Sequence, residues 1–418
     1  AMFLLSILLK WILLGRVRPG VHRVWGFYYW RWWLVNRLLS ATPTGYLVGT
    51  PLYRLYLRMM GAKIGRDGHF ASDCVRAFDL LTVGEDTSIG VDARLEGYSI
   101  EGGLLRIGAI TLGSRCYVGA RSILGLDTRM EDGSSLSELS LLPSGGRIPK
   151  GQRWVGSPAR PMPFGEEDRL RAATEAYKPS RLRKLAYAGL YGLGAFLVPV
   201  SFLAAILPGM MMLNELWVNT PGYFGYLWAV PLAALSYIVL LALEILAAKW
   251  LLLGRVRPGT YETHSFFYLR KWFIDQFMEI SLDLLAPLYA TLYLNPWYRA
   301  LGARLGARAE VSTAGAATPD LLAIGEEAFI ADAASLGTPR YDLGRVTLRT
   351  TTVGRRAFVG NSAVVPNGTE LGDLALVGVL SAPPLDPLEA RRVDASWLGS
   401  PAIYLPRRAH AGGFGEEA

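Results

Sequence analysis

The chain has 418 residues, more than one hydrophobic core usually supports, so we expect at least two domains. Hydrophobic residues make up 51% and charged residues only 19%, which is typical of a membrane protein and excludes an ordinary soluble domain. The net charge of +8 comes with no nucleic-acid-binding fingerprint, so we expect the lipid bilayer as a partner and no nucleic acid. Two cysteines are too few for a disulfide framework or a structural zinc site.

The chain contains two copies of one large unit. The segment KWILLGRVRPG at Lys10–Gly20 returns, 239 residues later, as KWLLLGRVRPG at Lys249–Gly259. Further along, Trp154–Ala159 returns as Trp397–Ala402, 243 residues later. Each copy runs from an apolar helix through an aromatic connector into a Gly-rich domain, so we expect the same fold twice.

The first copy begins with residues 1–16, which match only the end of the helix that leads into the second copy. We therefore expect a truncated transmembrane helix there. Residues 17–60 form an aromatic and basic connector, with four tryptophans between positions 24 and 34. This composition fits a helix in the lipid headgroup layer or an amphipathic helix packed on the next domain. Residues 266–273 repeat the feature more weakly in the second copy.

Residues 61–165 show a period of six. The aliphatic positions are Val83, Ile89 and Leu95, followed by Leu112, Val118, Leu124, Met130, Leu136, Leu142 and Ile148. Six is neither the helical period of 3.6 nor the strand period of 2, so the pattern predicts a parallel β-helix domain of about four coils, each with three short strands. Glycine often follows the aliphatic residue, as at Gly84, Gly90 and Gly119, and we expect it to supply a permissive backbone at the corners.

Residues 166–184 form a basic linker, and residues 185–253 a transmembrane hairpin. Its spans, 185–207 and 226–248, are long enough to cross a hydrocarbon layer of about 30 Å. The predicted loop from Pro208 to Tyr223 has no Lys or Arg, whereas both outer ends are basic. We therefore expect the loop outside and both Gly-rich domains in the cytosol.

The second copy has a connector at residues 254–301 and a second β-helix domain at 302–406. The tail at 407–418 is expected to lead to a further unit. The aliphatic series of this domain lies 241 residues after its counterparts, at Ile324, Ile330, Leu336, Val353, Val359, Val365, Leu371 and Val377. The predicted fold is therefore a mixed membrane protein in which a transmembrane α-helical hairpin joins two parallel β-helix domains.

The hexapeptide spacing and the closing segments, Val155–Arg160 and Leu398–Ala402, resemble those of hexapeptide-repeat (left-handed β-helix) acyltransferases. In that family a Gly-x-Pro-Ala segment lies beside the pantetheine arm of coenzyme A. The resemblance implies cofactor-binding positions at Gly119, Gly156, Ser157, Gly360, Asn361, Gly399 and Ser400. The structural alternative for the closing segment is a turn that caps the stack of coils, since proline ends strand pairing.

The larger arrangement of helix, Arg-x-Arg-Pro-Gly connector and hexapeptide domain resembles the carboxyl-terminal half of the ε-poly-lysine synthetase family, membrane-bound nonribosomal peptide synthetases. The resemblance implies a bacterial cytoplasmic membrane location, upstream adenylation and carrier domains, a third β-helix unit and trimer-like packing of β-helices. The expected cofactor is then the phosphopantetheine arm of the carrier. No cluster of residues has metal-ligand spacing, so we expect no metal.

The expected function is condensation and aminoacyl transfer, making amide bonds from carrier-linked aminoacyl thioesters. Two alternatives stay open: a membrane-anchored acyltransferase that uses acyl coenzyme A, and a non-enzymatic membrane scaffold. Amide formation needs a neutral amine and donors for the developing oxyanion. The four histidines are expected outside both coil stacks, at His22, His69, His264 and His410. We therefore expect the base to come from the third unit and this stretch alone to be inactive.

Candidate catalytic residues lie before and within the loops that interrupt the coils. They are Asp79, Tyr98, Glu101, Asp320, Tyr341 and Asp342. A carboxylate can orient an amine by a charge-assisted hydrogen bond, but an aspartate at a turn also bonds its own backbone. A loop tyrosine can donate to an oxyanion or simply pack. The interrupting loops, Glu96–Gly103 and Gly337–Gly344, are expected to project towards a neighbouring β-helix.

Overall fold

The computed structural model describes residues 2–163, 165–219, 227–285, 291, 293–312, 314–315 and 318–406. The chain forms two compact units. Unit 1 comprises Ala1–Tyr289 together with Pro339–Leu348, and unit 2 comprises Ala290–Thr338 together with Arg349–Ala418. The predicted tail, 407–418, lies outside the described residues.

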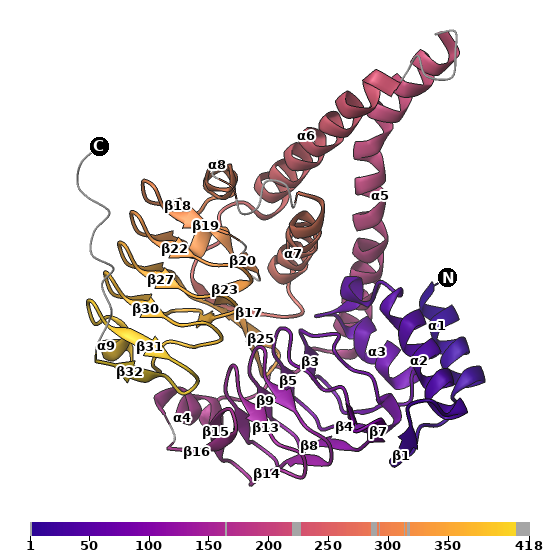
Figure 1. The fold of residues 1–418 in the computed structure, drawn as a ribbon, viewed down its shortest axis with the longest axis vertical. Coiled ribbons are helices and arrows are strands. Elements are labelled where there is room, and N and C mark those ends of the chain that lie inside the picture. The colour runs from indigo at the N-terminus through magenta and orange to yellow at the C-terminus, as the bar shows by residue number, and fades with distance from the viewer. Residues whose placement is uncertain are drawn as a thin grey trace. The chain divides into compact units, whose positions relative to one another are not determined.

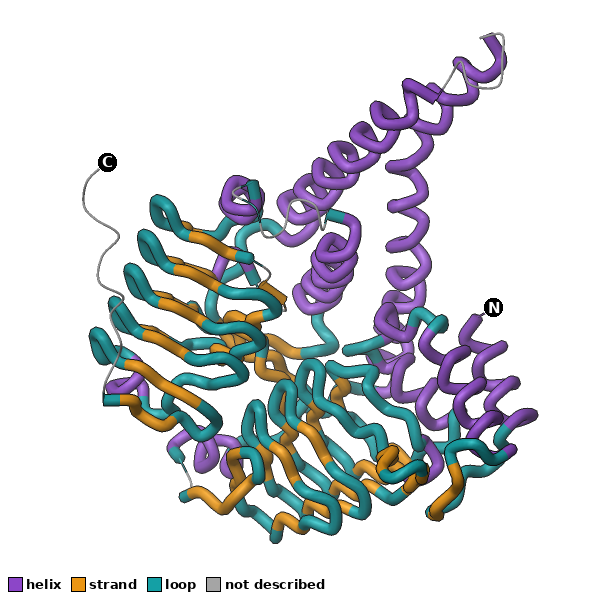
Figure 2. The backbone as a smooth tube through the Cα atoms, viewed as in Figure 1, coloured by secondary structure: helices purple, strands orange, loops and turns teal. Residues whose placement is uncertain are grey.

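Unit 1 contains a stack of short parallel strands, the first solenoid (Figures 1 and 2). In a complete coil a residue pairs with the one 18 positions further on, as in Tyr117 with Ser135 and Ser135 with Arg153. Its sheets have the orders β14-β11-β8-β4-β2, β16-β15-β12-β9-β5-β3 and β10-β13. The strands are β2 (Lys63–Ile64), β3 (His69–Phe70), β4 (Leu81–Val83), β5 (Ser88–Ile89), β8 (Ile110–Leu112), β9 (Tyr117–Val118), β10 (Ile123–Leu124), β11 (Thr128–Met130), β12 (Ser135–Leu136), β13 (Leu141–Leu142), β14 (Arg147–Ile148), β15 (Arg153–Gly156) and β16 (Ala159–Met162).

Unit 2 contains a second solenoid of the same kind. Its sheets have the orders β18-β21-β26-β29, β19-β22-β27-β30-β31-β32 and β20-β23-β28. The strands are β18 (Arg304–Leu305), β19 (Glu310–Val311), β20 (Ala314–Gly315), β21 (Leu322–Ile324), β22 (Phe329–Ile330), β23 (Ala334–Thr338), β26 (Thr351–Val353), β27 (Phe358–Val359), β28 (Val364–Pro366), β29 (Glu370–Leu371), β30 (Leu376–Val377), β31 (Ser396–Leu398) and β32 (Ile403–Leu405). Helices α8 (Leu294–Ala300) and α9 (Pro387–Ala390) flank it.

The aliphatic series predicted from the period of six forms the core of both solenoids. Each of these side chains is at most 4% exposed. Full burial of one such side chain contributes roughly 1.5–3 kcal/mol relative to exposure. The prediction of stacked parallel coils is therefore confirmed for both copies.

The glycines at the coil corners are explained by space. A Cβ on Gly119 would lie 2.4 Å from the backbone nitrogen of Glu138, and one on Gly360 would lie 2.7 Å from the carbonyl carbon of Gly378. The left-handed backbone conformation is adopted two residues later, at Arg121 (φ 55°) and Ser362 (φ 57°). We expected glycine at these corners because of its permissive backbone, and that explanation is wrong. Glycine is required there because the backbone of the next coil leaves no space for a side chain.

A hairpin interrupts each solenoid and pairs with a strand from the preceding connector. In the first copy, β1 (Gly20–Arg23), β7 (Leu104–Ile107) and β6 (Tyr98–Glu101) form an antiparallel sheet in the order β1-β7-β6. In the second copy, β17 (Gly259–Glu262), β25 (Arg345–Leu348) and β24 (Arg340–Asp342) form the sheet β17-β25-β24, and this sheet belongs to unit 1.

The connector helices pack on the solenoid edge within unit 1. They are α2 (Phe27–Ser40), η1 (Thr44–Leu47), α3 (Pro51–Met59) and α7 (Phe266–Leu284), and α1 (Met2–Leu13), in the predicted truncated transmembrane segment, packs beside α2. The short helices η2 (Phe78–Leu80) and, in unit 2, η5 (Pro319–Leu321) precede the first coils that carry the aliphatic series. On α2, Trp32 is buried while Trp30 and Trp33 are exposed. The helix therefore packs by one face, as predicted for an amphipathic helix on the adjacent domain. Its other face leaves aromatic side chains exposed.

After the linker helix α4 (Glu166–Ala173), the chain forms two long apolar helices. They are α5 (Arg181–Asn219) and α6 (Val230–Ala248), the latter with η3 (Leu227–Ala229) before it and η4 (Lys249–Leu253) after it. Both are long and apolar enough to cross a membrane. The loop predicted to start at Pro208 is wrong, since α5 runs through Pro208 to Asn219. Proline removes one hydrogen-bond donor, but the apolar residues beyond it continue the helix.

Candidate functional site

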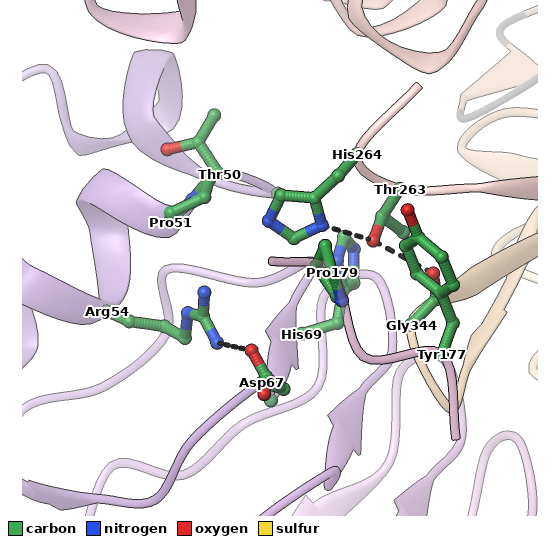
Figure 3. A pocket seen from close by; sticks show the side chains of 12 residues that line it. Thr50, Pro51, Arg54, Asp67, His69, Tyr177, Pro179, Thr263, His264 and Gly344 are labelled. Atoms are coloured by element: carbon green, nitrogen blue, oxygen red, sulfur yellow. Dashed lines mark hydrogen bonds and ion pairs between the residues drawn. The ribbon is translucent and has the colours of Figure 1, made fainter. Parts of the chain in front are cut away.

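A pocket in unit 1 is lined by residues from both copies of the repeat. It encloses about 430 Å³ of atom-free space, including the part open to solvent. Its lining residues are Gly49, Thr50, Pro51, Arg54, Asp67, Gly68, His69, Tyr177, Pro179, Thr263, His264 and Gly344 (Figure 3). The first copy thus supplies helix α3 and the first coil, and the second copy supplies the start of its connector and the turn of its hairpin.

His69 lies on β3, in the first coil, where it pairs in parallel with Ser88 of β5. The expectation that every histidine lies outside the coils is therefore wrong for His69. Its ring is stacked on Tyr341 of the docked hairpin, with centroids 4.1 Å apart. The side chain is only 8% exposed, and within the described part of the chain its Nε2 has no hydrogen-bond partner.

His264 follows β17 and is held by its neighbour Thr263. The Thr263 hydroxyl donates to the carbonyl oxygen of Gly344 at 2.9 Å and lies 3.3 Å from Nδ1 of His264. Because that hydroxyl has given its proton to Gly344, it can only accept from His264. This assigns the proton of His264 to Nδ1 and leaves Nε2 as the basic nitrogen. Nε2 is buried without a partner among the described residues.

Both imidazoles are held neutral. Burial lowers the pKa of His69 to about 3, and the charge of Arg54 adds to the effect. Burial and Arg54 likewise lower the pKa of His264 to about 4, with Asp67 acting in the opposite direction. A neutral imidazole can accept a proton from an amine, which an imidazolium cannot.

Three charged side chains, Asp67, Lys184 and Arg54, form a cluster beside the two histidines. The carboxylate of Asp67 accepts from the ammonium group of Lys184 at 2.6 Å. Arg54, from α3, is 3.9 Å from the same carboxylate (Figure 3). Thr50 caps α3 by accepting from the backbone N–H of Tyr53, and this fixes where the helix begins and hence where Arg54 lies.

Two of the predicted catalytic residues belong to the hairpin whose turn lines the pocket, although neither lines the pocket itself. Tyr341 stacks on His69, and Asp342, the next residue, accepts a hydrogen bond from Arg171 at 2.6 Å. The second interrupting loop therefore projects onto the first solenoid, as predicted. Burial raises the pKa of Tyr341, so its hydroxyl stays protonated. As a result it can serve as a hydrogen-bond donor.

The other four predicted catalytic residues lie elsewhere in the chain and also do not line the pocket. Asp79 is buried in an ion pair with Lys10 at 2.8 Å and also accepts from the backbone N–H of Val17. Tyr98 packs edge-on against Trp32, with centroids 4.6 Å apart. Glu101 is exposed at the end of β6, and Asp320 lies in η5 of unit 2. Their catalytic roles stay predictions.

The residues predicted to bind the cofactor lie at coil corners and closing turns. Gly119 and Gly360 follow inward-pointing valines, and the backbone oxygen of Asn361 accepts from Leu380 of the next coil. The closing segments form the turns of the β15–β16 and β31–β32 hairpins, at Gly156, Ser157, Gly399 and Ser400. A capping turn is thus observed in both copies, and cofactor binding there stays a prediction.

Sequence reasoning missed Arg54, Asp67, Lys184, Thr263 and His264 as site residues. A signal was present in the repeat itself. Where the second copy has Thr263 and His264, the first has Val24 and Trp25, 239 positions earlier in an otherwise similar segment. Two adjacent polar residues in one copy replace two apolar residues in the other. Such a difference marks residues that the shared fold does not require and that are therefore candidates for a site.

No protein-family model matches the chain. Among solved structures, a galactoside acetyltransferase in complex with coenzyme A is 13% identical over 40% of this chain and 96% of its own, with a TM-score of 0.30. A serine acetyltransferase from Neisseria gonorrhoeae in complex with serine is 18% identical over 38% of this chain and 69% of its own, with a TM-score of 0.21. A hexapeptide-repeat acetyltransferase from Vibrio cholerae covers 39% of this chain and 89% of its own at 11% identity, with a TM-score of 0.22. With scores this low, the description of the solenoids rests on their strand pairing.

One curated relative matches along nearly the whole chain. Delta-poly-L-ornithine synthetase of Acinetobacter baumannii (strain AB307-0294) is 36% identical over 98% of this chain. The chain spans about a third (31%) of the length of that relative. The resemblance predicted from the sequence is therefore confirmed: the chain is similar to a poly-amino-acid synthetase of the same kind as ε-poly-lysine synthetase.

Proposed function

We propose that this chain is the amide-forming region of a poly-amino-acid synthetase and that the pocket of unit 1 holds the reacting groups. One observation carries the proposal. The Nε2 atoms of His69 and His264 are buried at one pocket, and neither has a partner within the described part of the chain. A buried polar atom without a partner is costly, and it is the arrangement expected where a substrate supplies the missing hydrogen bond.

The proposed step joins an amine to a carrier-linked aminoacyl thioester. The amine nitrogen attacks the carbonyl carbon of the thioester, and Nε2 of His264 accepts the proton that the nitrogen loses. The new C–N bond forms, the C–S bond breaks, and the leaving thiolate takes the proton from His264. An amide and a free thiol result, so the atoms balance without a further reactant. General base catalysis of this kind contributes about 10²–10⁴-fold to a rate.

We propose the phosphopantetheine arm of a carrier domain as the source of the thiol. The turn at Gly156–Ser157 closes the last coil of the first solenoid. Arg153 on β15 and Arg160 on β16 lie on the two strands beside it and offer cations for a phosphate. His69 lies at the other end of the same sheet. Four strand spacings separate β3 from β15, or about 19 Å, which an extended arm can span.

The test uses the 418-residue chain purified in detergent, supplied with lysyl- or ornithyl-pantetheine thioester and the matching free amino acid. We expect dipeptide by mass spectrometry, and a loss of at least 100-fold with His264→Gln or His69→Gln. His22→Gln is the control, because His22 stacks on Tyr28 and does not line the pocket. The expected inactivity of this stretch rested in part on placing every histidine outside the coils, and that placement is wrong for His69.

No dipeptide from the unsubstituted chain, or variants that form dipeptide as fast as the unsubstituted chain, would overturn the proposal. Acetyl coenzyme A in place of the aminoacyl thioester tests the first alternative. Acetylated amino acid formed at a higher rate than dipeptide would favour an acyltransferase that uses free acyl coenzyme A. A chain inactive with every donor would favour a scaffold.

We also propose that α5 and α6 cross the bacterial cytoplasmic membrane and that both solenoids, whose coils we infer to be left-handed, face the cytosol. Arg181 and Lys184 in the first turn of α5 and Arg255 after α6 support this orientation. In intact cells carrying Cys74→Ser, an impermeant thiol reagent should label Asn219→Cys and not Lys150→Cys. Labelling in the reverse order would contradict it. Upstream adenylation and carrier domains, a third β-helix unit and trimer-like packing stay proposals drawn from the resemblance.

A further inference from the structure

Arg54 is a buried guanidinium whose hydrogen-bonding capacity is unused. Its side chain is only 13% exposed. Within the described part of the chain, its one ion-pair partner is Asp67, at 3.9 Å, and it donates no hydrogen bond. Arg58, one turn later on α3, instead donates three hydrogen bonds to the backbone oxygens of Ile64 and Gly65. A guanidinium carries five N–H donors, so Arg54 has its donors available at the pocket.

The negative charge beside Arg54 is already neutralised. Lys184 contacts both carboxylate oxygens of Asp67, at 2.6 and 2.7 Å. These distances are far shorter than the 3.9 Å between Asp67 and Arg54. Arg183, which donates to the carbonyl oxygen of His264, is itself paired with Glu262. With both histidines neutral, the cluster of Arg54, Lys184 and Asp67 therefore holds two cations and one anion. One more negative group would balance it.

We propose that Arg54 binds the free carboxylate of the acceptor substrate, an amino acid or peptide whose amine then lies at Nε2 of His264. This inference rests on the proposed amide-forming function and adds the class of acceptor that the site takes. A carboxylate matches the planar fork of arginine by two parallel hydrogen bonds, so it fixes orientation as well as charge. The amine at the other end of the substrate would be held facing the base.

The electrostatics of the histidines support this assignment. Arg54 is the largest charged contributor that lowers the pKa of His69 and of His264. A carboxylate paired with Arg54 would offset that charge and raise the pKa of both imidazoles. Each would then become a stronger base only when an acceptor is bound, since basicity near the working pH favours proton transfer.

The second copy of the repeat lacks this arrangement. By the alignment of the copies, 241 positions apart, Asn295 stands where the first copy has Arg54, and Arg308 stands where it has Asp67. The position of His69 is taken by Glu310 on β19. The equivalent helix of the second copy, α8, therefore has no cation at the position of Arg54. Its Arg299, like Arg58 in the first copy, donates to backbone oxygens, those of Leu305 and Gly306.

The experiment measures dipeptide or amide formation with four acceptors: lysine, lysinamide, 1,5-diaminopentane and ornithine. We expect Arg54→Gln to raise the KM for lysine and ornithine at least tenfold, as expected for losing charge-assisted hydrogen bonds. The KM for lysinamide and diaminopentane should change less than twofold. Arg54→Lys, which keeps the charge and loses the fork, should lie between. Arg66→Gln is the matched control, because Arg66 is exposed and does not line the pocket.

Each outcome decides one proposal. If Arg54→Gln raises the KM for all four acceptors equally, or for none, the carboxylate assignment fails while the amide-forming function stands. If it raises only the KM for the thioester donor, Arg54 binds the phosphate of the arm and the assignment is again overturned. If the unsubstituted chain makes no product, the underlying function fails first. A melting temperature within about 2 °C of the parent, a shift of under 1 kcal/mol, shows that each variant is folded.

Discussion

The two connectors of the chain share one backbone arrangement but carry different side chains at equivalent positions. In the first copy the N–H of Val24 donates to the carbonyl of Gly103 at 2.9 Å, and in the second that of Thr263 donates to Gly344 at 3.0 Å. At the next residue Trp25 is 99% exposed, whereas His264 is 7% exposed. The residue that follows the connector strand of this three-stranded sheet is thus an exposed tryptophan in one copy and a buried histidine in the other.

The solenoid edges differ in the opposite sense. The first solenoid carries His69 and Asp67, while the second carries Glu310 and Arg308 at the equivalent positions. Each copy therefore supplies one part of the site: the first copy supplies helix α3 and the coil edge, and the second supplies the start of its connector and the turn of its hairpin. The repeat provides two similar scaffolds, and each contributes different polar groups to the pocket of unit 1.

Exchanging the two connector residues should produce the largest effect. His264→Trp gives the second connector the residue of the first and removes the proposed base, so we expect amide formation to fall about 1,000-fold. Trp25→His should leave the rate unchanged, because position 25 is exposed and lies outside the pocket. Rates are measured by mass spectrometry of the dipeptide. A loss in Trp25→His equal to that in His264→Trp would contradict the division of roles.

Equivalent substitutions in the scaffold that the two copies share should destabilise both copies by similar amounts. We expect Gly119→Arg and Gly360→Arg each to lower the free energy of unfolding by about 3 kcal/mol, since the side chain must displace the next coil. Tyr98→Phe and Tyr341→Phe remove only a hydroxyl and should cost less. Thermal melts of the four variants in detergent provide the measurement. Equal melting temperatures would count against the assigned register.

The shared scaffold was predictable from the sequence because its determinants are periodic. Inward side chains recur every six residues, and the two aliphatic series lie at a constant offset, so the coils could be assigned. The first coil was missed because Ile64 pairs with Val83, 19 residues later instead of 18. This one-residue irregularity hid β3, and with it the place of His69.

The site was less predictable because its parts are distant in the sequence. Arg54, His69, Tyr177 and His264 come from segments that no local pattern connects. Tyr341 and Asp342 were predicted since they lie on an interruption of the coils, which sequence periodicity reveals. The residues that Tyr341 and Asp342 contact could not be predicted, because those contacts depend on how the second hairpin packs within unit 1.

Acidification should distinguish the buried histidine from its exposed counterpart. The pKa of His264 is lowered to about 4 in the folded chain, against about 6.5 when unfolded. Below pH 6.5 the unfolded chain binds a proton that the folded chain does not, so stability falls as the pH falls towards 4. His264→Gln should remove about 2 kcal/mol of the loss between pH 7 and pH 5. Trp25→His should add none, because an exposed histidine is not desolvated. Denaturant titrations at the two pH values test both, and equal pH dependence in the parent and His264→Gln would contradict the burial argument.

The smallest effect concerns the residue that sets the tautomer of His264. Thr263→Val installs the side chain that the first copy has at Val24, keeps the shape and keeps the backbone hydrogen bond to Gly344. What it removes is the hydroxyl that accepts from Nδ1 and donates to the carbonyl of Gly344. Without that acceptor the proton can move to Nε2, which is then no longer a base, so we expect amide formation to fall about tenfold, as for the loss of one ordinary hydrogen bond. Thr263→Ser retains the hydroxyl and should restore most of the rate, whereas a merely structural role for the methyl group would make serine the worse substitution. Comparable rates in the parent and Thr263→Val would show that Thr263 does not select the tautomer and that the two connectors differ only in the imidazole itself.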